Sequence, residues 1–123
     1  MIQKGTLLKI TDNSGVKEVK CIQVLKKKQG SLGDLAVVSV QKLDPKKGSK
    51  LKKIKKGEIF FCLIVRTKVK FLRQDGCKLK FLENSGVLLN NQFNPLGSRS
   101  TGPTIRELRK HHVKILSTFE KVI

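Results

Sequence analysis

The sequence predicts a mainly β protein, a small antiparallel barrel followed by short helices at the C-terminal end. Five or six short apolar or alternating segments are separated by turn-forming residues, and two helix signals follow them. With 123 residues, of which 38% are hydrophobic, the chain can form a single core. We therefore expect one domain, with the barrel and a projecting ribbon over about residues 1–91 and a loop with short helices over about residues 92–123.

The first three strands are expected at residues 7–10, 19–25 and 35–43. The first is closed by the turn-rich stretch "TDNSG", the second alternates between apolar and polar residues, and the third is rich in valine. A basic, glycine-containing connection, residues 26–34, joins the second strand to the third.

A lysine-rich segment follows the third strand. Residues 44–58, "DPKKGSKLKKIKKGE", contain seven lysines together with Pro45, Gly48 and Gly57. Proline and glycine disfavour the interior of a regular element, so this segment is predicted to be a loop or a projecting ribbon.

A fully apolar strand then leads into a hairpin. Residues 59–65, "IFFCLIV", are apolar at every position, which is typical of a strand covered on both faces. The hairpin spans residues 65–81 with its turn at Asp75 and Gly76, and its return strand is expected at residues 77–83. Lysines alternate with apolar residues on both sides of the turn, so the outward face carries almost only positive charge.

One more strand and two short helices complete the predicted elements. The strand is expected at residues 86–90, before a long loop that contains two prolines. Thr104 and Glu107 have the spacing of a capping box, in which the hydroxyl accepts from a first-turn amide and the carboxylate reaches back. They predict a short helix over residues 104–110, and "VKILSTFEKV", residues 113–122, predicts a second one.

Net charge is the strongest functional signal in the sequence. Lysine and arginine number 27 against nine acidic residues, for a formal charge of +18 at pH 7. Self-repulsion of this size destabilises a compact monomer and a polyanion relieves it, so nucleic acid is the expected partner. A membrane surface is the competing partner. Because the sequence has no long basic amphipathic helix and no apolar stretch near the roughly 20 residues that cross a bilayer, we expect no membrane partner.

The aromatic content indicates which kind of nucleic acid is bound. Trp and Tyr are absent and the six Phe mostly occupy apolar strand positions, which disfavours gripping single strands by base stacking. No helix-turn-helix or zinc finger is visible. What remains is recognition of folded, mostly double-helical RNA by its shape and its phosphates. The residues expected to contact phosphates are Lys46, Lys47, Lys50, Lys52, Lys53, Lys55, Lys56, Arg66, Lys68, Lys70, Arg73, Lys78, Lys80, Arg106 and Arg109.

The sequence offers little for catalysis or metal binding. His111 and His112 are neighbours, so on a helix they point about 100° apart and cannot share a metal. "GSLGD" lacks the lysine of a phosphate-binding loop, and the carboxylates are scattered. We expect no enzyme, no metal and no cofactor. Cys21, Cys62 and Cys77 are odd in number and far apart, which indicates free thiols in a reducing compartment rather than disulfides.

Three stretches of the chain resemble a known family. They are "MIQKGTLLKITDNSGVKEVKCIQVL", "LIVRTKVKFLRQDGCKLKFLENSGVLLNN" and "NPLGSRSTGPTIREL", and they are similar to the universal large-subunit ribosomal protein L-fourteen in its bacterial and organellar form. The signature of the resemblance comprises Leu63, Ile64, Val65, Asp75, Gly76, Phe81, Asn84, Val87 and Leu88. The chain departs from the family pattern at Cys62, where Gly or Ala is preferred. Residues 26–34 are shorter than in the family, and residues 45–56 are longer and richer in lysine.

The resemblance implies a five-stranded barrel with a protruding ribbon and two small C-terminal helices. It also implies that the chain binds large-subunit rRNA, lies beside neighbouring large-subunit proteins and faces small-subunit rRNA at intersubunit bridges. Gly97, Ser98 and Arg99 match the family loop at that face, and the same neighbourhood receives a ribosomal silencing factor that blocks subunit joining. Thr104 and Glu107 are interpreted as structural caps.

Three classes of function stay open at this point: a permanent ribosomal component, a free RNA-binding module such as a barrel-type translation factor, and an RNA hydrolase. A permanent component should co-sediment with large subunits and require high salt or denaturant for removal, and we expect this outcome. The absence of a leader and the bias toward lysine over arginine predict an organelle-encoded protein of the mitochondrial matrix, with the bacterial cytoplasm as second choice.

Overall fold

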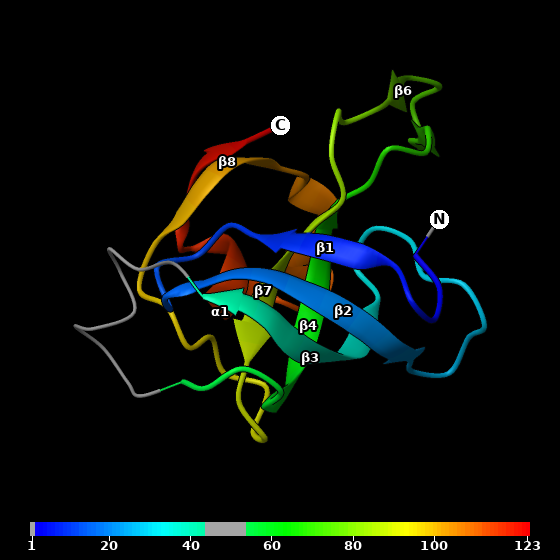
Figure 1. Ribbon diagram of the computed structural model, residues 1–123. Coiled ribbons are helices and arrows are strands. Elements are labelled where there is room, and N and C mark those ends of the chain that lie inside the picture. The colour runs from blue at the N-terminus through cyan, green and yellow to red at the C-terminus, as the bar shows by residue number, and fades with distance from the viewer. Residues whose placement is uncertain (1, 44–53) are drawn as a thin grey trace.

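The computed structural model describes residues 2–43 and 54–123, and its centre is a closed five-stranded barrel (Figure 1). The strands follow each other around the barrel in the order β1-β2-β3-β4-β7. Their bounds are β1 (Leu7–Ile10), β2 (Val16–Val24), β3 (Leu35–Leu43), β4 (Ile59–Arg66) and β7 (Ser85–Leu89). The predicted mainly β class and the five-stranded barrel are confirmed.

The barrel closes through one parallel pair of strands. Four of the five pairings are antiparallel, but β1 and β7 run in the same direction, with Lys9 opposite Ser85 and Ile10 opposite Gly86. An odd number of strands cannot alternate in direction all the way round, so one pair must be parallel. The barrel is therefore antiparallel as predicted except at this seam.

Two apolar clusters lie on the two sides of β4 and β7. One fills the barrel and includes Leu8, Val38 and Ile64. The other lies outside the barrel wall, where alternate residues of β4 and β7 pack against the C-terminal part of the chain. Strand β4 is thus buried on both faces over most of its length, as its apolar sequence predicted, although Ile59 at its start is 63% exposed.

The hairpin projects from the end of the barrel (Figure 1). Its paired part is shorter than predicted, since β5 (Phe71–Leu72) and β6 (Lys78–Leu79) each have two residues. The return strand expected at residues 77–83 ends early because the chain bends toward the barrel, where the amide of Phe81 donates to the carbonyl of Thr67 at 3.2 Å. The lysine-rich ribbon expected at residues 44–58 falls largely outside the described residues.

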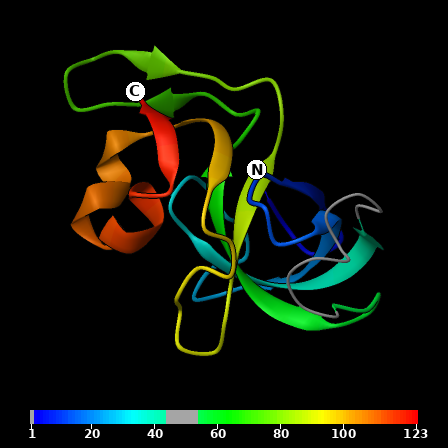
Figure 2. The same ribbon diagram turned by 90° about the vertical axis from the view of Figure 1, so that its left-hand side faces the viewer.

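The C-terminal region differs from the sequence prediction. It comprises β8 (Ser100–Thr104), the 3₁₀ helix η1 (Arg106–Lys110), the helix α1 (Val113–Leu116) and β9 (Phe119–Val122). Strands β8 and β9 form a parallel pair (Figure 2). The second predicted helix is therefore wrong after residue 116, because the backbone of β9 bonds to β8 across the sheet instead of to its own preceding turn.

The predicted capping box is also wrong. Residue Thr104 ends β8, and its hydroxyl donates to the carbonyl of Val65 at 3.4 Å rather than accepting from η1. The N-cap of η1 is Ile105, which makes no side-chain cap. The carboxylate of Glu107 is bound by Arg73 from the hairpin, so it cannot reach back to the helix start.

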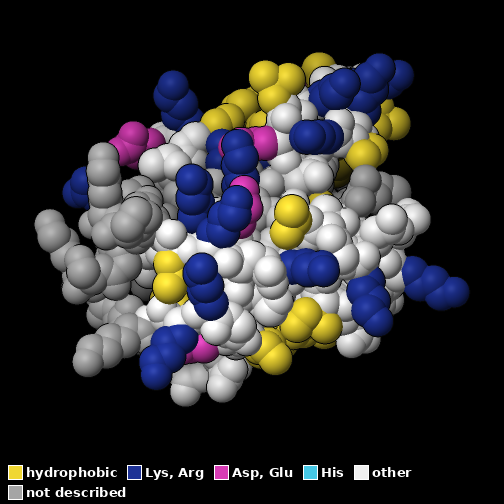
Figure 3. Space-filling view, viewed as in Figure 1, with side chains coloured by type: hydrophobic (Ala, Val, Ile, Leu, Met, Phe, Trp, Pro, Cys, Tyr) yellow, Lys and Arg dark blue, Asp and Glu magenta, His cyan; other side chains and the backbone are white. Residues whose placement is uncertain are grey.

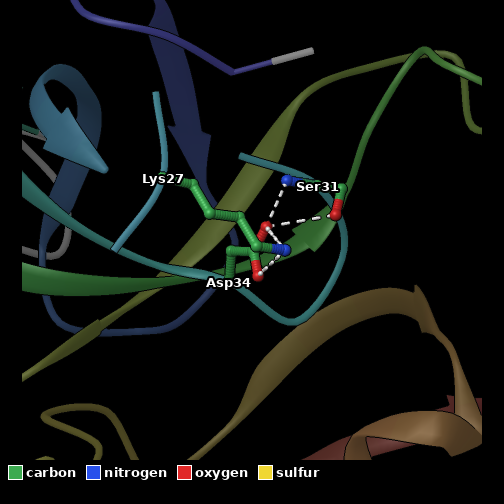
Figure 4. A network of polar contacts seen from close by, with 3 residues as sticks. All are labelled: Lys27, Ser31 and Asp34. Atoms are coloured by element: carbon green, nitrogen blue, oxygen red, sulfur yellow. Dashed lines mark hydrogen bonds and ion pairs between the residues drawn. The ribbon is translucent and has the colours of Figure 1, made fainter. Parts of the chain in front are cut away.

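The connection between β2 and β3 is held by a polar network (Figure 4). Asp34 accepts hydrogen bonds from the amide of Ser31 at 2.7 Å and from its hydroxyl at 3.1 Å, and Lys27 lies 3.3 Å from the same carboxylate. This network orders a segment in which several lysines are exposed.

Among the described residues, no helix has the length and apolar character that a membrane crossing requires.

Candidate nucleic-acid interface

The hairpin presents its lysines on a face supported by the core. Phe71 lies opposite Leu79 in the pair, and both pack against the outer apolar cluster. Because side chains alternate along a strand, the residues flanking this apolar pair point outward. The exposed lysines of the hairpin are Lys68, Lys70, Lys78 and Lys80. The predicted alternation holds only in part, because Lys78 stands opposite Leu72, which is 64% exposed, and Val69 is 44% exposed as well.

The hairpin turn is fixed by Asp75. Its carboxylate accepts a hydrogen bond from the amide of Cys77 at 3.0 Å, and this bond lowers the pKa of Asp75 below its usual value. The guanidinium of Arg106 on η1 lies 3.9 Å from the other carboxylate oxygen. An exposed arginine from the C-terminal region therefore lies beside the tip of the hairpin.

Arg66, predicted as a phosphate contact, is buried at the base of the hairpin. Its guanidinium pairs with Glu83 at 3.1 Å, and Glu83 also pairs with Lys9 of β1 at 3.3 Å. Gly102 of β8 covers the guanidinium so closely that a β-carbon there would lie 1.9 Å from Nη1. Arg66 thus links the hairpin base, β1 and β8.

Burial and charge act in opposite directions on the pKa values of this pair. Burial lowers the pKa of the Arg66 guanidinium, and attraction to Glu83 opposes that shift. Partial burial raises the pKa of Glu83, but the bond from Lys9 and the charge of Arg66 outweigh it, so the net pKa lies below the usual value. Glu83 is therefore ionised at neutral pH.

Arg73, a second predicted phosphate contact, is also directed into the protein. Its side chain is 8% exposed, and its Nε lies 2.9 Å from the carboxylate of Glu107 on η1. The same guanidinium donates to the main-chain oxygen of Ile123. Arg73 therefore fastens the middle of the hairpin to the C-terminal region.

The remaining predicted cations are divided between the described surface and the undescribed segment. The exposed ones are Lys55, Lys56, Lys68, Lys70, Lys78, Lys80, Arg106 and Arg109. Those outside the described residues are Lys46, Lys47, Lys50, Lys52 and Lys53. Figure 3 shows lysine and arginine side chains spread over one face of the molecule, with few acidic side chains between them.

The loop that contains Gly97, Ser98 and Arg99 is clamped by Asn13. The Asn13 side-chain oxygen accepts from the amides of Ser98 at 2.9 Å and Arg99 at 3.4 Å, and its amide nitrogen donates to the Ser98 hydroxyl at 2.9 Å. A β-carbon on Gly97 would lie 2.6 Å from the same Asn13 oxygen, so this position requires glycine. The side chains of Ser98 and Arg99 are exposed on this ordered loop.

Sequence reasoning missed the role of Asn13, because "TDNSG" reads as an ordinary turn. Its neighbour Asp12 is buried, and its carboxylate accepts from the amide of Ser14 at 3.2 Å, the hydroxyl of Ser14 at 2.6 Å and the amide of Leu88 at 3.2 Å. Asparagine and aspartate often bind nearby main chain. Here they also bind distant main chain, which the sequence alone does not show.

The two neighbouring histidines do not form a metal site with other side chains. Within residues 2–43 and 54–123, no group of three or more His, Cys, Asp or Glu side chains is placed to hold a metal ion. The ring centroids of His111 and His112 are 6.3 Å apart, and burial lowers the pKa of His112. The described part of the molecule thus combines an exposed cationic surface with an internally bonded scaffold.

Comparison with known protein families identifies the family of this chain. The family model described as Ribosomal protein L14p/L23e matches residues 1–123. The match covers the barrel, the hairpin, the clamped loop and the C-terminal strands and helices. The chain belongs to the ribosomal protein L14p/L23e family and is a structural protein of the large ribosomal subunit.

Proposed function

We propose that the chain binds large-subunit rRNA through the exposed cations of the hairpin, the end of the lysine-rich segment and η1. The observation that carries this proposal is the hairpin itself, whose four exposed lysines stand on a ribbon fixed by two buried arginines. In this role Arg66 and Arg73 position the surface, and the exposed lysines contact phosphates. The five lysines of residues 46–53, which lie outside the described residues, are also proposed to contact phosphates.

Electrostatics explains why such a surface suits RNA. Lysines close together on one face of a ribbon repel each other, and phosphates placed between them offset that repulsion. Each phosphate contact also releases counterions from the RNA, so affinity depends steeply on salt. The proposed role is structural rather than enzymatic.

We further propose that the loop at Gly97, Ser98 and Arg99 contributes to contacts with small-subunit rRNA. The support is the clamp by Asn13, which holds the loop backbone while leaving the Ser98 and Arg99 side chains exposed. A silencing factor that blocks subunit joining is a second proposed ligand of this loop. Both ligands would compete for the same residues.

The ribosome that contains this protein is proposed to be mitochondrial. Lysine-heavy usage of basic residues supports an organellar gene, and a bacterial ribosome is the second choice. The proposed neighbours are large-subunit rRNA and adjacent large-subunit proteins.

Sedimentation of a lysate tests the proposed function. The tagged chain is expected to co-sediment with particles that contain large-subunit rRNA, and to leave them only in high salt or denaturant. A chain that stays at the top of the gradient while fully assembled large subunits sediment without it would contradict a permanent structural role and favour a free RNA-binding module.

A further inference from the structure

An aromatic side chain is exposed on strained backbone at the end of the barrel opposite the hairpin. Phe93 has a φ of 60° and is 46% exposed. A β-carbon disfavours this left-handed conformation, and Phe lacks the local hydrogen bonds that let Asn or Asp adopt it. The turn that carries Phe93, residues 90–94, projects at the lower end of the barrel in Figures 1 and 2.

The turn is held by Asn90 and does not depend on Phe93 for its shape. The Asn90 side-chain oxygen accepts from the amides of Gln92 at 2.9 Å and Asn94 at 3.0 Å. The Asn90 amide donates to the carbonyl of Asn94 at 2.9 Å, and the amide of Phe93 donates to the carbonyl of Asn90 at 3.0 Å. Glycine or asparagine at position 93 would fit this backbone with less strain. A strained residue kept on an ordered turn points to a role for its side chain.

The Phe93 ring is supported from behind. Its centroid lies 4.8 Å from that of Phe61 on β4, with the two rings tilted by 41°. Among the six Phe, all of which lie in the described residues, Phe93 alone is exposed. A ring held by an aromatic neighbour and exposed to solvent offers a ready surface for another planar group.

The surroundings of the ring favour RNA over an apolar protein segment. Asn91 and Gln92 are exposed amides that can hydrogen bond to base edges and ribose hydroxyls. The ammonium of Lys114 lies 3.3 Å from the side-chain oxygen of Asn94, within reach of a phosphate next to the turn. The hollow of about 350 Å³ on the other side of Asn90 and Asn91 is lined mainly by apolar side chains, with Glu58 as its acidic residue, and it forms no part of the proposed RNA contact.

We propose that Phe93 stacks on one unpaired nucleobase of the bound RNA. The proposal rests on the proposed rRNA binding and adds a contact that reads an unstacked base rather than a phosphate. It revises the expectation that base stacking is disfavoured, which rested on the Phe residues lying mostly in apolar strand positions. Base stacking on an aromatic ring tolerates any base, so it adds affinity without strict sequence preference.

Two RNA stem-loops, one fully paired in its stem and one with a single bulged nucleotide, test this proposal with the full-length chain. The bulged base is 2-aminopurine, whose fluorescence is quenched on stacking. The wild-type chain is expected to quench it and to bind the bulged RNA about tenfold tighter than the fully paired one. Phe93→Leu keeps an apolar side chain against Phe61 but loses the aromatic face, so it should abolish both the quenching and the preference.

Two further variants separate stacking from general apolar contact. Phe93→Trp keeps an aromatic face and should retain the preference for the bulged RNA. Leu82→Ala removes an apolar side chain that is 91% exposed outside this turn, and it should leave the preference unchanged. Thermal unfolding of each variant shows whether it is folded. The quenching measured with the wild-type chain tests the proposal even if a variant does not fold.

Four results would overturn the proposal. Equal binding of bulged and paired RNA by the wild-type chain would exclude stacking of Phe93 on an unpaired base. The proposed rRNA binding would not be affected by that result. An unchanged preference in Phe93→Leu would place the stacking elsewhere. Loss of a neighbouring protein from reassembled subunits by Phe93→Leu, with both RNAs still bound as by wild type, would make the turn a protein contact. Absence of binding to either RNA at low salt would overturn the proposed function as well.

Discussion

At the scale of single residues, the barrel wall contains a close pair formed by Cys62 and Gly86. The two residues lie on adjacent strands, and a β-carbon on Gly86 would lie 2.3 Å from the Cys62 sulfur and 3.0 Å from the carbonyl of Leu63. Cys62 is fully buried, and burial raises the pKa of its thiol. The sulfur therefore occupies space that a larger residue at position 86 would need, which explains how the barrel accepts cysteine at position 62.

This pair predicts a stability effect with a specific rescue. Gly86→Ala should lower the free energy of unfolding by about 1–3 kcal/mol, because the new methyl group overpacks the wall. Adding Cys62→Ala should restore much of that loss, since the sulfur is the nearest obstacle. Urea unfolding of the two single variants and the double variant measures both effects. If Gly86→Ala unfolds like wild type, the close packing of this pair is wrong.

The ion pair between Arg66 and Glu83 predicts a pH dependence. Glu83→Gln should reduce stability at pH 7 by about 1–3 kcal/mol, because it leaves the buried Arg66 without its charged partner. Since the pKa of Glu83 is lowered in the folded state, its contribution is complete above the ordinary glutamate pKa of about 4.3 and is lost as the pH falls through the lower folded value. The difference between wild type and variant should therefore shrink below about pH 4.

Urea unfolding at pH 7, 5 and 3.5 follows this difference. Glu120→Gln is the matched control, because Glu120 is exposed on β9 and the same change in net charge should leave stability nearly unaltered there. A difference between wild type and Glu83→Gln that stays constant down to pH 3.5 would show that the carboxylate charge does not stabilise the fold.

At the scale of elements, the hairpin depends on contacts beyond its own four paired residues. A hairpin this short is marginal by itself, so its geometry relies on anchors. Phe71 and Leu79 fix it to the outer apolar cluster, while Arg73 connects it to η1 and to Ile123, the residue after β9. The orientation of the lysines is therefore set by the C-terminal region.

Removing the anchor from η1 tests this dependence. Glu107→Gln should weaken the contact between residue 107 and Arg73. Hydrogen exchange of the amides in residues 71–79 should therefore become faster, while that of the barrel amides should change little. Hydrogen exchange followed by mass spectrometry resolves the two regions. Equal protection of the hairpin in wild type and variant would show that the apolar pair alone holds it, and equal acceleration in the barrel would show global destabilisation instead.

The elements that sequence reasoning found are those whose signal is local. The barrel strands were predicted because apolar or alternating residues with turns between them specify a strand wherever it pairs. The stretch "FEKV" of β9 is predicted as a helix, because only its first residue is buried and its strand conformation depends on pairing with β8. The inward direction of Arg73 depends on Glu107, 34 positions along the chain. The exposure of Phe93 likewise depends on how its turn meets the barrel.

At the scale of the whole molecule, the described structure has two projections at opposite ends of the barrel. The hairpin with its lysines lies at one end, and the turn with Phe93 lies at the other (Figures 1 and 2). The nine acidic residues offset only nine of the 27 basic residues, which leaves the formal net charge of +18 without a counter-charge in the chain. Under the proposed function, the surrounding RNA supplies the compensating negative charge.

The salt dependence of rRNA binding tests this central claim most directly. The hairpin variant replaces Lys68, Lys70, Lys78 and Lys80 with glutamine, and a control of equal charge replaces the exposed Lys4, Lys17, Lys20 and Lys28. Affinity for large-subunit rRNA is measured from low to high salt. The hairpin variant should bind more weakly, with a slope of log affinity against log salt that is less steep by about one per lysine removed, and the control should change less. A hairpin variant with the wild-type slope would contradict the claim that these lysines neutralise RNA phosphates.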